Sequence, residues 1–597
     1  MKNQTDYRIA LLRLFMKENG LQGFIVPSTD GHISEYIPEH WASRKWISGF
    51  SGSAGTVVVT RDKAGLWTDS RYFLQAENEI SGSEIKLFKD RLPETISITD
   101  WLKSELSAND QVGIDGNVYP AKEALKLKAD LESEKITLVS DFDPFETIWN
   151  DRPALPQKSV SIFPVEIAGE SVSQKIKRVL AEAEKLNANT LWISSLDTVA
   201  WLFNIRGSDV AYNPVVVAHA FISPNKTLFF VDRDKISPTL EAMLQKEGVQ
   251  VVDYRQHINF LNDICNESVC LDSSKISYSI YLKLKSRNRV IDTPSIADCL
   301  KSMKNEVESE GFRRTMISDG VALTRFFRWL EQNIQKGTVT EYIVSQKLKE
   351  YRSQQNHFIG ESFPAIVGYM ANGSIVHYCP SEANSLKIKP EGLLLIDSGG
   401  QYLEGTTDIT RTIAVGEVSD EMKKDFTFVL KGMIALSKAV FPAGTRGSQI
   451  DVLARQAMWA SGINYGHGTG HGVGHYLNVH EGPQSIRQEE NPATLKIGMV
   501  ITNEPGIYRD RQYGIRTENM LLIQKALTTS YGDFYHFETL TLCYIDTTLI
   551  LKELMTIEEI TWLTNYHRMV YEKLAPHLSD EENDWLKNKS NNGILPL

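Results

Sequence analysis

The first half of the chain contains two stretches with the same order of predicted elements. The first runs from a helical segment (YRIALLRLFMKENG) to a strand (GFIVPS), then WISGFSGS, then the paired strands GTVVVTRD and AGLWTDSRYF. The second repeats this order with KIKRVLAEAEKL, TLWISSLD, WLFNIRGS and HAFISPNKTLFFVDRD. Helical spacing of apolar residues and alternating β-rich runs distinguish the two kinds of element. The sequence therefore predicts a strand-rich α/β unit that occurs twice.

The domain plan follows from this repeat. A chain of 597 residues exceeds what one hydrophobic core usually supports. The Pro- and Asp-rich segment 141–159 fits a linker between the two copies, and at 292–304 a Pro-containing turn leads into a long helix. We therefore predict three domains, at residues 1–155, 156–298 and 299–597.

Composition and charge exclude several classes of partner. No apolar run approaches the roughly 20 residues of a membrane span, and the charged N-terminal segment lacks the apolar stretch of a secretory signal. We therefore expect a soluble, cytoplasmic protein without a membrane partner. A net charge of -11 with dispersed Lys and Arg gives no positive surface for nucleic acid. Five cysteines without CxxC spacing argue against a disulfide framework and a thiolate metal site.

Two aspartates flank a Gly-rich turn in the last predicted domain. In GLLLIDSGGQYLEGTTDITRT an apolar strand ends at Asp397, and a Thr-rich strand carries Asp408. A hairpin of that length can bring both carboxylates to the same side of a two-stranded ribbon. Either aspartate alone is more typical of a turn or a solvated strand face. Two carboxylates brought together, however, need a cation.

The segment HGTGHGVGHYLNVHEGP concentrates histidines. It contains His467, His471, His475 and His480, and the glycines between them allow backbone and ligands to approach closely. One imidazole ligand suits Mn, Co, Zn or Fe better than Mg or Ca, while the remaining imidazoles can donate hydrogen bonds to a substrate.

Two glutamates complete the set. Glu504 ends the apolar strand of GMVITNEPGIY, immediately before Pro505. In YGIRTENMLLI, Arg516 and Glu518 are two residues apart, so we expect them on one face of a strand. A single glutamate at a strand end is usually solvated. Four carboxylates and one imidazole together, however, match the ligand count of a paired-metal hydrolase.

This order of Asp, Asp, His, Glu and Glu resembles the pita-bread metallopeptidases, a family that includes methionine aminopeptidase, prolidase and aminopeptidase P. The words DSGGQYLEGTTDITRT, NEPGIY and GIRTEN look most like the three-domain aminopeptidase P. IPEHWASRKWISGFSGSAGT and LDTVAWLFNIRGSDVAYNPV resemble creatinase-type N-terminal domains. The resemblance implies an α/β fold with two creatinase-type domains followed by a C-terminal pita-bread catalytic domain.

The resemblance also implies the site residues. The metal ligands fall on Asp397, Asp408, His471, Glu504 and Glu518. The substrate-binding side chains fall on His377 of NGSIVHYCP, His467, His480 and Arg516. The family pattern does not require His475, which we predict to be structural.

The implied activity is release of the first residue from peptides with proline second. Two divalent metal ions, with Mn2+ expected and Co2+ or Zn2+ as alternatives, would share the attacking hydroxide. Glu504 is predicted to move the proton, His480 to stabilise the developing charge and His377 to steer the leaving side. His467 is expected to line the proline pocket, and Arg516 to orient Glu518.

Two other functions remain open from the sequence. A prolidase-type Xaa-Pro dipeptidase shares every metal ligand, and a binding protein could keep this fold without its metals. The intact ligand set disfavours the second, and bound-metal analysis would separate the two classes. The family tendency and an amphipathic helical region at residues 556–589 favour a homodimer, and the final NNGILPL is predicted to fray.

Overall fold

The computed structural model describes residues 4–591, and the chain divides into two compact units. The first unit extends to Val165 and resumes from Glu170 to Leu300, while the second contains Glu166–Gly169 and the chain from Lys301 onward. The boundaries between the three predicted domains stay a prediction. The predicted frayed tail lies outside the described residues from position 592.

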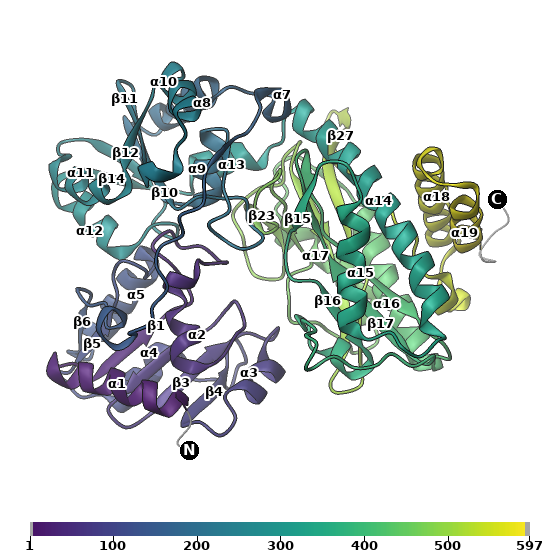
Figure 1. Ribbon diagram of the computed structural model, residues 1–597, viewed down its shortest axis with the longest axis horizontal. Helices are drawn as coiled ribbons and strands as arrows, with labels where there is room; N and C mark the ends of the chain where they lie inside the picture. The colour runs from purple at the N-terminus through teal and green to yellow at the C-terminus, as the bar shows by residue number, and fades with distance from the viewer. Residues whose placement is uncertain (1–3, 592–597) are drawn as a thin grey trace. The chain divides into compact units, whose positions relative to one another are not determined.

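Two six-stranded sheets of the first unit share one topology (Figure 1). The first sheet has the order β4 (Ile85–Lys89), β3 (Ala64–Thr68), β2 (Thr56–Thr60), β1 (Gly23–Val26), β5 (Gln111–Ile114) and β6 (Thr137–Val139). The second has the order β12 (Val249–Asp253), β11 (Lys226–Val231), β10 (Ala218–Ser223), β8 (Thr190–Ile193), β13 (Ser268–Leu271) and β14 (Arg289–Asp292). In both, the first strand along the chain pairs antiparallel on one side and parallel on the other. The predicted internal repeat is confirmed.

Helices accompany each sheet in matching positions. The predicted helices that precede β1 and β8 are α1 (Gln4–Glu18) and α8 (Val172–Lys185). A capping box of Ser171 and Gln174 begins α8, and one face of that helix is buried. The first copy also contains α2 (Ser43–Ser48), α3 (Phe73–Glu79), α4 (Ile98–Glu105), α5 (Ala121–Glu132) and α6 (Phe145–Ile148). After it follow α7 (Val165–Ala168), α9 (Leu196–Leu202), α10 (Pro238–Lys246), α11 (His257–Asp263), α12 (Tyr278–Arg287) and α13 (Ile296–Ser302), with the short pair β7 (Ser161–Ile162) and β9 (Ile205–Arg206).

The second unit is built on several antiparallel sheets. Its six-stranded sheet has the order β21 (Val440–Pro442), β28 (Gly532–Thr539), β27 (Asn519–Thr529), β24 (Val500–Asn503), β22 (Gly470–Gly472) and β23 (Glu481–Ile486). Two three-stranded sheets follow the orders β16 (Ile366–Tyr369), β17 (Leu393–Ser398), β20 (Ile409–Ala414), and β15 (Phe358–Glu361), β18 (Gly400–Tyr402), β19 (Gly405–Thr406). The hairpin β25 (Gly506–Arg509) and β26 (Tyr513–Arg516) completes the set.

Long helices bury the apolar faces of these strands. They are α14 (Glu306–Ile334), α15 (Glu341–Ser353), α16 (Asp420–Ser437), α17 (Gly447–Trp459), α18 (Ile557–Leu574) and α19 (Asp580–Asn591). A capping box of Asn305 and Glu308 begins α14, whose Phe312 and Phe326 join the same buried cluster as Leu394 of β17. Burial of each such side chain contributes about 1.5–3 kcal/mol to the free energy of unfolding. The packed strands therefore hold the polar residues at their ends in fixed positions.

The predicted amphipathic C-terminal region forms α18 and α19, which pack against each other and against α14. The apolar face of this region is therefore buried within one chain. The homodimer stays a prediction. Among the described residues, no helix combines the length and apolar character that a membrane span requires.

The structure bears out one expectation about local geometry and corrects another. β17 and β20 pair antiparallel as the expected two-stranded ribbon, with Asp397 opposite Thr410 and Asp408 directly before β20, although the residues between the two strands also form β18 and β19 of another sheet. Arg516 and Glu518 do not share a strand, because β26 ends at Arg516 and β27 begins at Asn519. The chain passes from one sheet to another between these two residues.

Candidate active site

Three residues that are distant in sequence form a group that could hold a metal ion. Asp408 precedes β20, His471 lies on β22, and Glu518 lies between β26 and β27. Ligand atoms of these three residues lie within 4.8 Å of one another. The His471 Nε2 to Asp408 Oδ2 distance is 3.3 Å, and the side chains of Asp408 and Glu518 are buried.

Glu504 lies beside this group. Its Oε1 is 3.5 Å from Nε2 of His471 and accepts a hydrogen bond of 3.3 Å from the Thr502 hydroxyl. The Glu504 side chain retains 19% exposure, so it faces a space that solvent or substrate can reach. Of the four carboxylates, it is the one suited to exchange a proton with a bound molecule.

The His471 imidazole is oriented by its own strand. Its Nδ1 lies 2.9 Å from the carbonyl oxygen of Gly472, which can only accept a hydrogen bond. The proton therefore belongs on Nδ1, which leaves the lone pair of Nε2 toward Asp408 and Glu504. This is the tautomer that a metal ligand requires.

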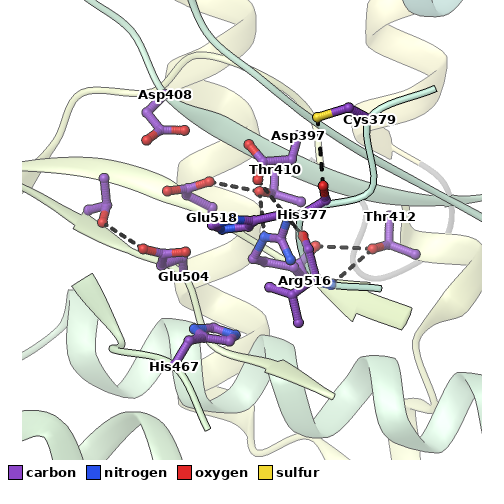
Figure 2. Close-up of polar contacts among 12 residues, drawn as sticks. His377, Cys379, Asp397, Asp408, Thr410, Thr412, His467, Glu504, Arg516 and Glu518 are labelled. Carbon is purple, nitrogen blue, oxygen red and sulfur yellow. Dashed lines mark hydrogen bonds and ion pairs between the residues drawn. The ribbon is translucent and has the colours of Figure 1, made fainter. Parts of the chain in front are cut away.

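Asp397 belongs to an ion pair that continues into the rest of the site. At the end of β17, its Oδ2 accepts a 2.6 Å hydrogen bond from Nη2 of Arg516, which is buried (Figure 2). Arg516 also donates from Nη1 to the Tyr508 hydroxyl and from Nε to the Thr410 hydroxyl. Thr410 in turn donates a 2.7 Å hydrogen bond to Oε2 of Glu518. The predicted contact of Arg516 with Glu518 is thus relayed by Thr410, and the direct partner of Arg516 is Asp397.

The carboxyl groups perturb one another strongly. Burial, followed by repulsion from Asp397, raises the pKa of Asp408 well above its usual range. Burial and repulsion from Asp408 do the same to the pKa of Glu518. Burial and repulsion from Glu518 raise the pKa of Glu504 to about 8. Acids that destabilise each other in this way are stabilised in their ionised form by a bound cation.

The donor set fits divalent metal ions. Beyond the grouping of Asp408, His471 and Glu518, the Oδ1 atom of Asp397 is buried and has no hydrogen-bond partner among the described residues. Such an atom is costly unless a ligand satisfies it. Carboxylate oxygens and one imidazole, without a thiolate, are typical of Mn, Co, Zn or Fe sites.

His480 lies beside the His471 ring, and buried charges hold the residue after it. The centroids of the two imidazoles are 4.3 Å apart in an edge-on arrangement. The buried carboxylate of Glu481 forms ion pairs with Lys301, at 2.8 Å, and with Lys304. Those contacts fix the backbone immediately after His480. The half-buried side chain of His480 is therefore kept beside the group that could hold a metal ion.

His467 and Tyr508 form a second polar contact at the site. The Tyr508 hydroxyl lies 2.8 Å from Nε2 of His467, whose Nδ1 lies 2.8 Å from the carbonyl oxygen of Gly468. Since Nδ1 must donate to that carbonyl, the hydroxyl donates to Nε2. Burial raises the pKa of Tyr508 to about 12, so the hydroxyl keeps its proton.

His377 and His475 occupy different surroundings. His377 lies in the loop after the 3-10 helix η4 (Met370–Ser374), and the carbonyl of the preceding Val376 lies 3.4 Å from Nη2 of Arg516. This contact connects its loop to the Arg516 network. His475 is buried and packs edge-on against Phe312 of α14, as a structural histidine would.

The sequence reasoning did not single out Tyr508 or Thr410. Tyr508 ends the word NEPGIY, and Thr410 lies in the Thr-rich strand after Asp408. The signal that could have identified them is that each is a hydroxyl-bearing residue within a motif that also carries a predicted metal ligand. Their roles depend on β25, β26 and β20 meeting in space, which a local pattern does not show.

Comparisons with known proteins cover nearly the whole chain. Residues 8–146 and 151–308 each match a creatinase/prolidase N-terminal domain. Residues 310–525 match metallopeptidase family M24, and residues 533–592 match the C-terminal region of M24 peptidases. The predicted fold class, two creatinase-type α/β domains followed by a pita-bread catalytic domain, is confirmed.

The chain belongs to metallopeptidase family M24. It is 41% identical to a probable Xaa-Pro aminopeptidase P of Laccaria bicolor, over 98% of this chain and 93% of that one. It is 37% identical to Xaa-Pro aminopeptidase 1 of Dictyostelium discoideum, over 99% and 96% of the two chains. A crystal structure of X-prolyl aminopeptidase from Caenorhabditis elegans, described as a cytosolic enzyme with a di-nuclear active site, matches all of both chains with a TM-score of 0.95 and 33% identity.

Proposed function

We propose that this protein is an Xaa-Pro aminopeptidase that releases the first residue of peptides with proline at the second position. The observation that carries the proposal is the grouping of Asp408, His471 and Glu518 beside Glu504, in a chain that matches Xaa-Pro aminopeptidases along its length. The scissile bond before proline lacks an N–H, so a site must recognise it by the metals, the amine and the ring.

We propose two divalent metal ions per chain, held by Asp397, Asp408, His471, Glu504 and Glu518, with Mn2+ as the expected ion. Grouped carboxylates and the orphaned Oδ1 of Asp397 support this number of ligands. When bound, such ions would lower the pKa of a coordinated water and polarise the scissile carbonyl.

Glu504 is the proposed proton carrier. Its raised pKa, about 8 without metal, reflects burial and neighbouring Glu518, and its partly exposed carboxylate borders the group. It takes the proton of the attacking water and passes it to the proline nitrogen, which leaves as a neutral amine. The Thr502 hydroxyl keeps the carboxylate pointed at this position.

The arrangement of Asp397 and Arg516 supports a requirement for a free amino terminus on the substrate. Arg516 occupies only Oδ2 of Asp397, which leaves Oδ1 to interact with a metal or with the substrate α-amine. The Arg516 guanidinium is itself held by Asp397, Tyr508 and Thr410. It is therefore committed to the protein and does not serve as the cation for a proline carboxylate, as a dipeptidase would need.

His480 is proposed to donate a hydrogen bond to the oxyanion of the tetrahedral intermediate, with His377 on the leaving side and His467 beside the proline ring. We expect His480→Ala to lower kcat by about 100- to 1,000-fold, the usual loss of about 2.7–4 kcal/mol for one oxyanion donor, while both metals are retained. Steady-state kinetics and metal analysis measure the two parts. His536→Ala, on β28, is the matched control and keeps normal activity. Loss of metal from the His480 variant would instead make that residue a ligand.

A peptide panel tests the proposed specificity. Relative kcat/KM values for Arg-Pro-Pro, Arg-Pro, Arg-Ala-Pro and acetyl-Arg-Pro-Pro should show efficient cleavage of the first, weak cleavage of the second and none of the last two. The ring and the missing N–H explain the proline requirement, and the amine contact explains the effect of acetylation. A marked preference for Arg-Pro over Arg-Pro-Pro would identify a prolidase-type dipeptidase.

We also propose that the enzyme acts in the cytoplasm as a homodimer on peptide substrates. The description of the Caenorhabditis elegans relative as cytosolic supports the location. Sedimentation analysis of the purified chain measures the dimer.

A further inference from the structure

The buried carboxylate of Glu341 accepts hydrogen bonds from the loop that carries His377. Glu341 is fully buried at the start of α15. The backbone N–H of Tyr369 donates to Oε1 at 2.7 Å, and the backbone N–H of Leu386 donates to Oε2 at 2.7 Å. These two residues flank the loop, so one carboxylate holds both of its ends.

Two side chains within the loop reach the same carboxylate. The Asn372 amide lies 3.1 Å from Oε1 and 3.0 Å from Oε2, and the Tyr378 hydroxyl lies 3.2 Å from Oε2. That hydroxyl also lies 2.9 Å from the carbonyl of Asn384, so its single proton serves one acceptor at a time. Asn372 lies within η4, before His377, and Tyr378 directly follows His377.

The main chain reinforces this connection. The Glu341 N–H donates to the Leu386 carbonyl at 3.1 Å, while Thr340 pairs with Lys387. On the other side, the carbonyl of Val376 contacts Arg516. The residue before His377 is therefore tied to the metal-side network, and the residue after it is tied to Glu341.

We infer that Glu341 is a positioning residue for catalysis, which acts by fixing the His377 loop relative to the metal-binding side chains. This inference rests on the proposed role of His377. The carboxylate is buried, and it accepts hydrogen bonds from four donors that lie at the two ends of the loop and within it. A loop released from these bonds samples positions in which the His377 imidazole misses the leaving group, and such misplacement can cost about 100-fold in rate.

Glu341→Gln is a sharp test because it keeps the shape of the side chain. One backbone N–H faces each carboxylate oxygen, so a glutamine must turn its NH2 group toward one of these donors. We expect kcat to fall by about 10- to 100-fold, with KM nearly unchanged and both metals retained. Glu350→Gln, on the exposed side of the same helix, is the matched control and keeps normal kinetics.

A double-mutant cycle separates positioning from general damage. If Glu341 acts through His377, Glu341→Gln lowers kcat/KM in the normal background and changes it less than twofold in a His377→Ala background. The full loss in both backgrounds would overturn the positioning role, as would loss of metal from Glu341→Gln. Normal activity of His377→Ala alone would overturn the proposed role of His377 and this inference with it.

Tyr378→Phe gives a second, milder route to the same answer. It removes one donor to Glu341 and leaves the backbone contacts in place. If Glu341→Gln does not fold, the cycle is run with Tyr378→Phe, for which we expect a severalfold loss of kcat that disappears in the His377→Ala background. An equal loss in both backgrounds would overturn the inference.

Discussion

Glu504→Gln is expected to lower kcat by about 10,000-fold, the largest effect of any single substitution in this site. General acid–base catalysis by one side chain is worth up to about 10,000-fold, and Glu504 is in addition a proposed metal ligand. The amide keeps one oxygen near His471 but cannot accept a proton at physiological pH. Single-turnover kinetics with Arg-Pro-Pro measures the chemical step directly.

Metal content decides how the Glu504 result is interpreted. A variant that keeps two metals and loses activity has lost its proton carrier. If it keeps two metals and retains kcat within tenfold of the original, another group moves the proton and the assignment is wrong. Glu350→Gln, an exposed carboxylate of α15, controls for the loss of a negative charge.

Removal of metal is expected to abolish hydrolysis completely, and Mn2+, followed by Co2+, should restore it best. A site of four carboxylates and one imidazole favours such intermediate ions. The assay measures Arg-Pro-Pro hydrolysis after exhaustive chelation and after each metal is added back. Full activity of the chelated, metal-free protein would end the two-metal proposal.

The same carboxylates make metal binding depend on pH. Burial and mutual repulsion raise the pKa of Asp408 and Glu518, and raise that of Glu504 from 4.5 to about 8. Between the unfolded value and about 8, the folded metal-free protein binds more protons than the unfolded chain, so its free energy of unfolding falls as pH rises. Metal ions displace these protons and bind more tightly at higher pH.

The expected result is a metal-induced rise in Tm that is small near pH 5.5 and large near pH 8. At a metal concentration about 1,000 times Kd, binding adds about 4 kcal/mol to the free energy of unfolding. Thermal unfolding with and without Mn2+ across this range measures the difference. A rise in Tm that is the same at both pH values would contradict the raised pKa values of these acids.

Much of the architecture could be predicted because it depends on the spacing of apolar residues within short segments. Helical spacing and alternating strands located α1, β1, α8 and β8, and their repeated order predicted two sheets of one topology. The places where this reasoning failed are local as well. A continuous strand was expected through Arg516 and Glu518, but the chain leaves one sheet for another there, and sequence periodicity does not report which sheet a strand joins.

The sequence by itself determined the kind of chemistry, because the side-chain types at Asp397, Asp408, His471, Glu504 and Glu518 and their motifs are properties of single residues and short segments. Only the tertiary structure decided the connections between them. Arg516 pairs with Asp397 and reaches Glu518 through Thr410, and Glu341 holds the His377 loop. These contacts join residues from separate strands, helices and loops, and such pairings are fixed by the packing of the whole unit, which no local sequence pattern encodes.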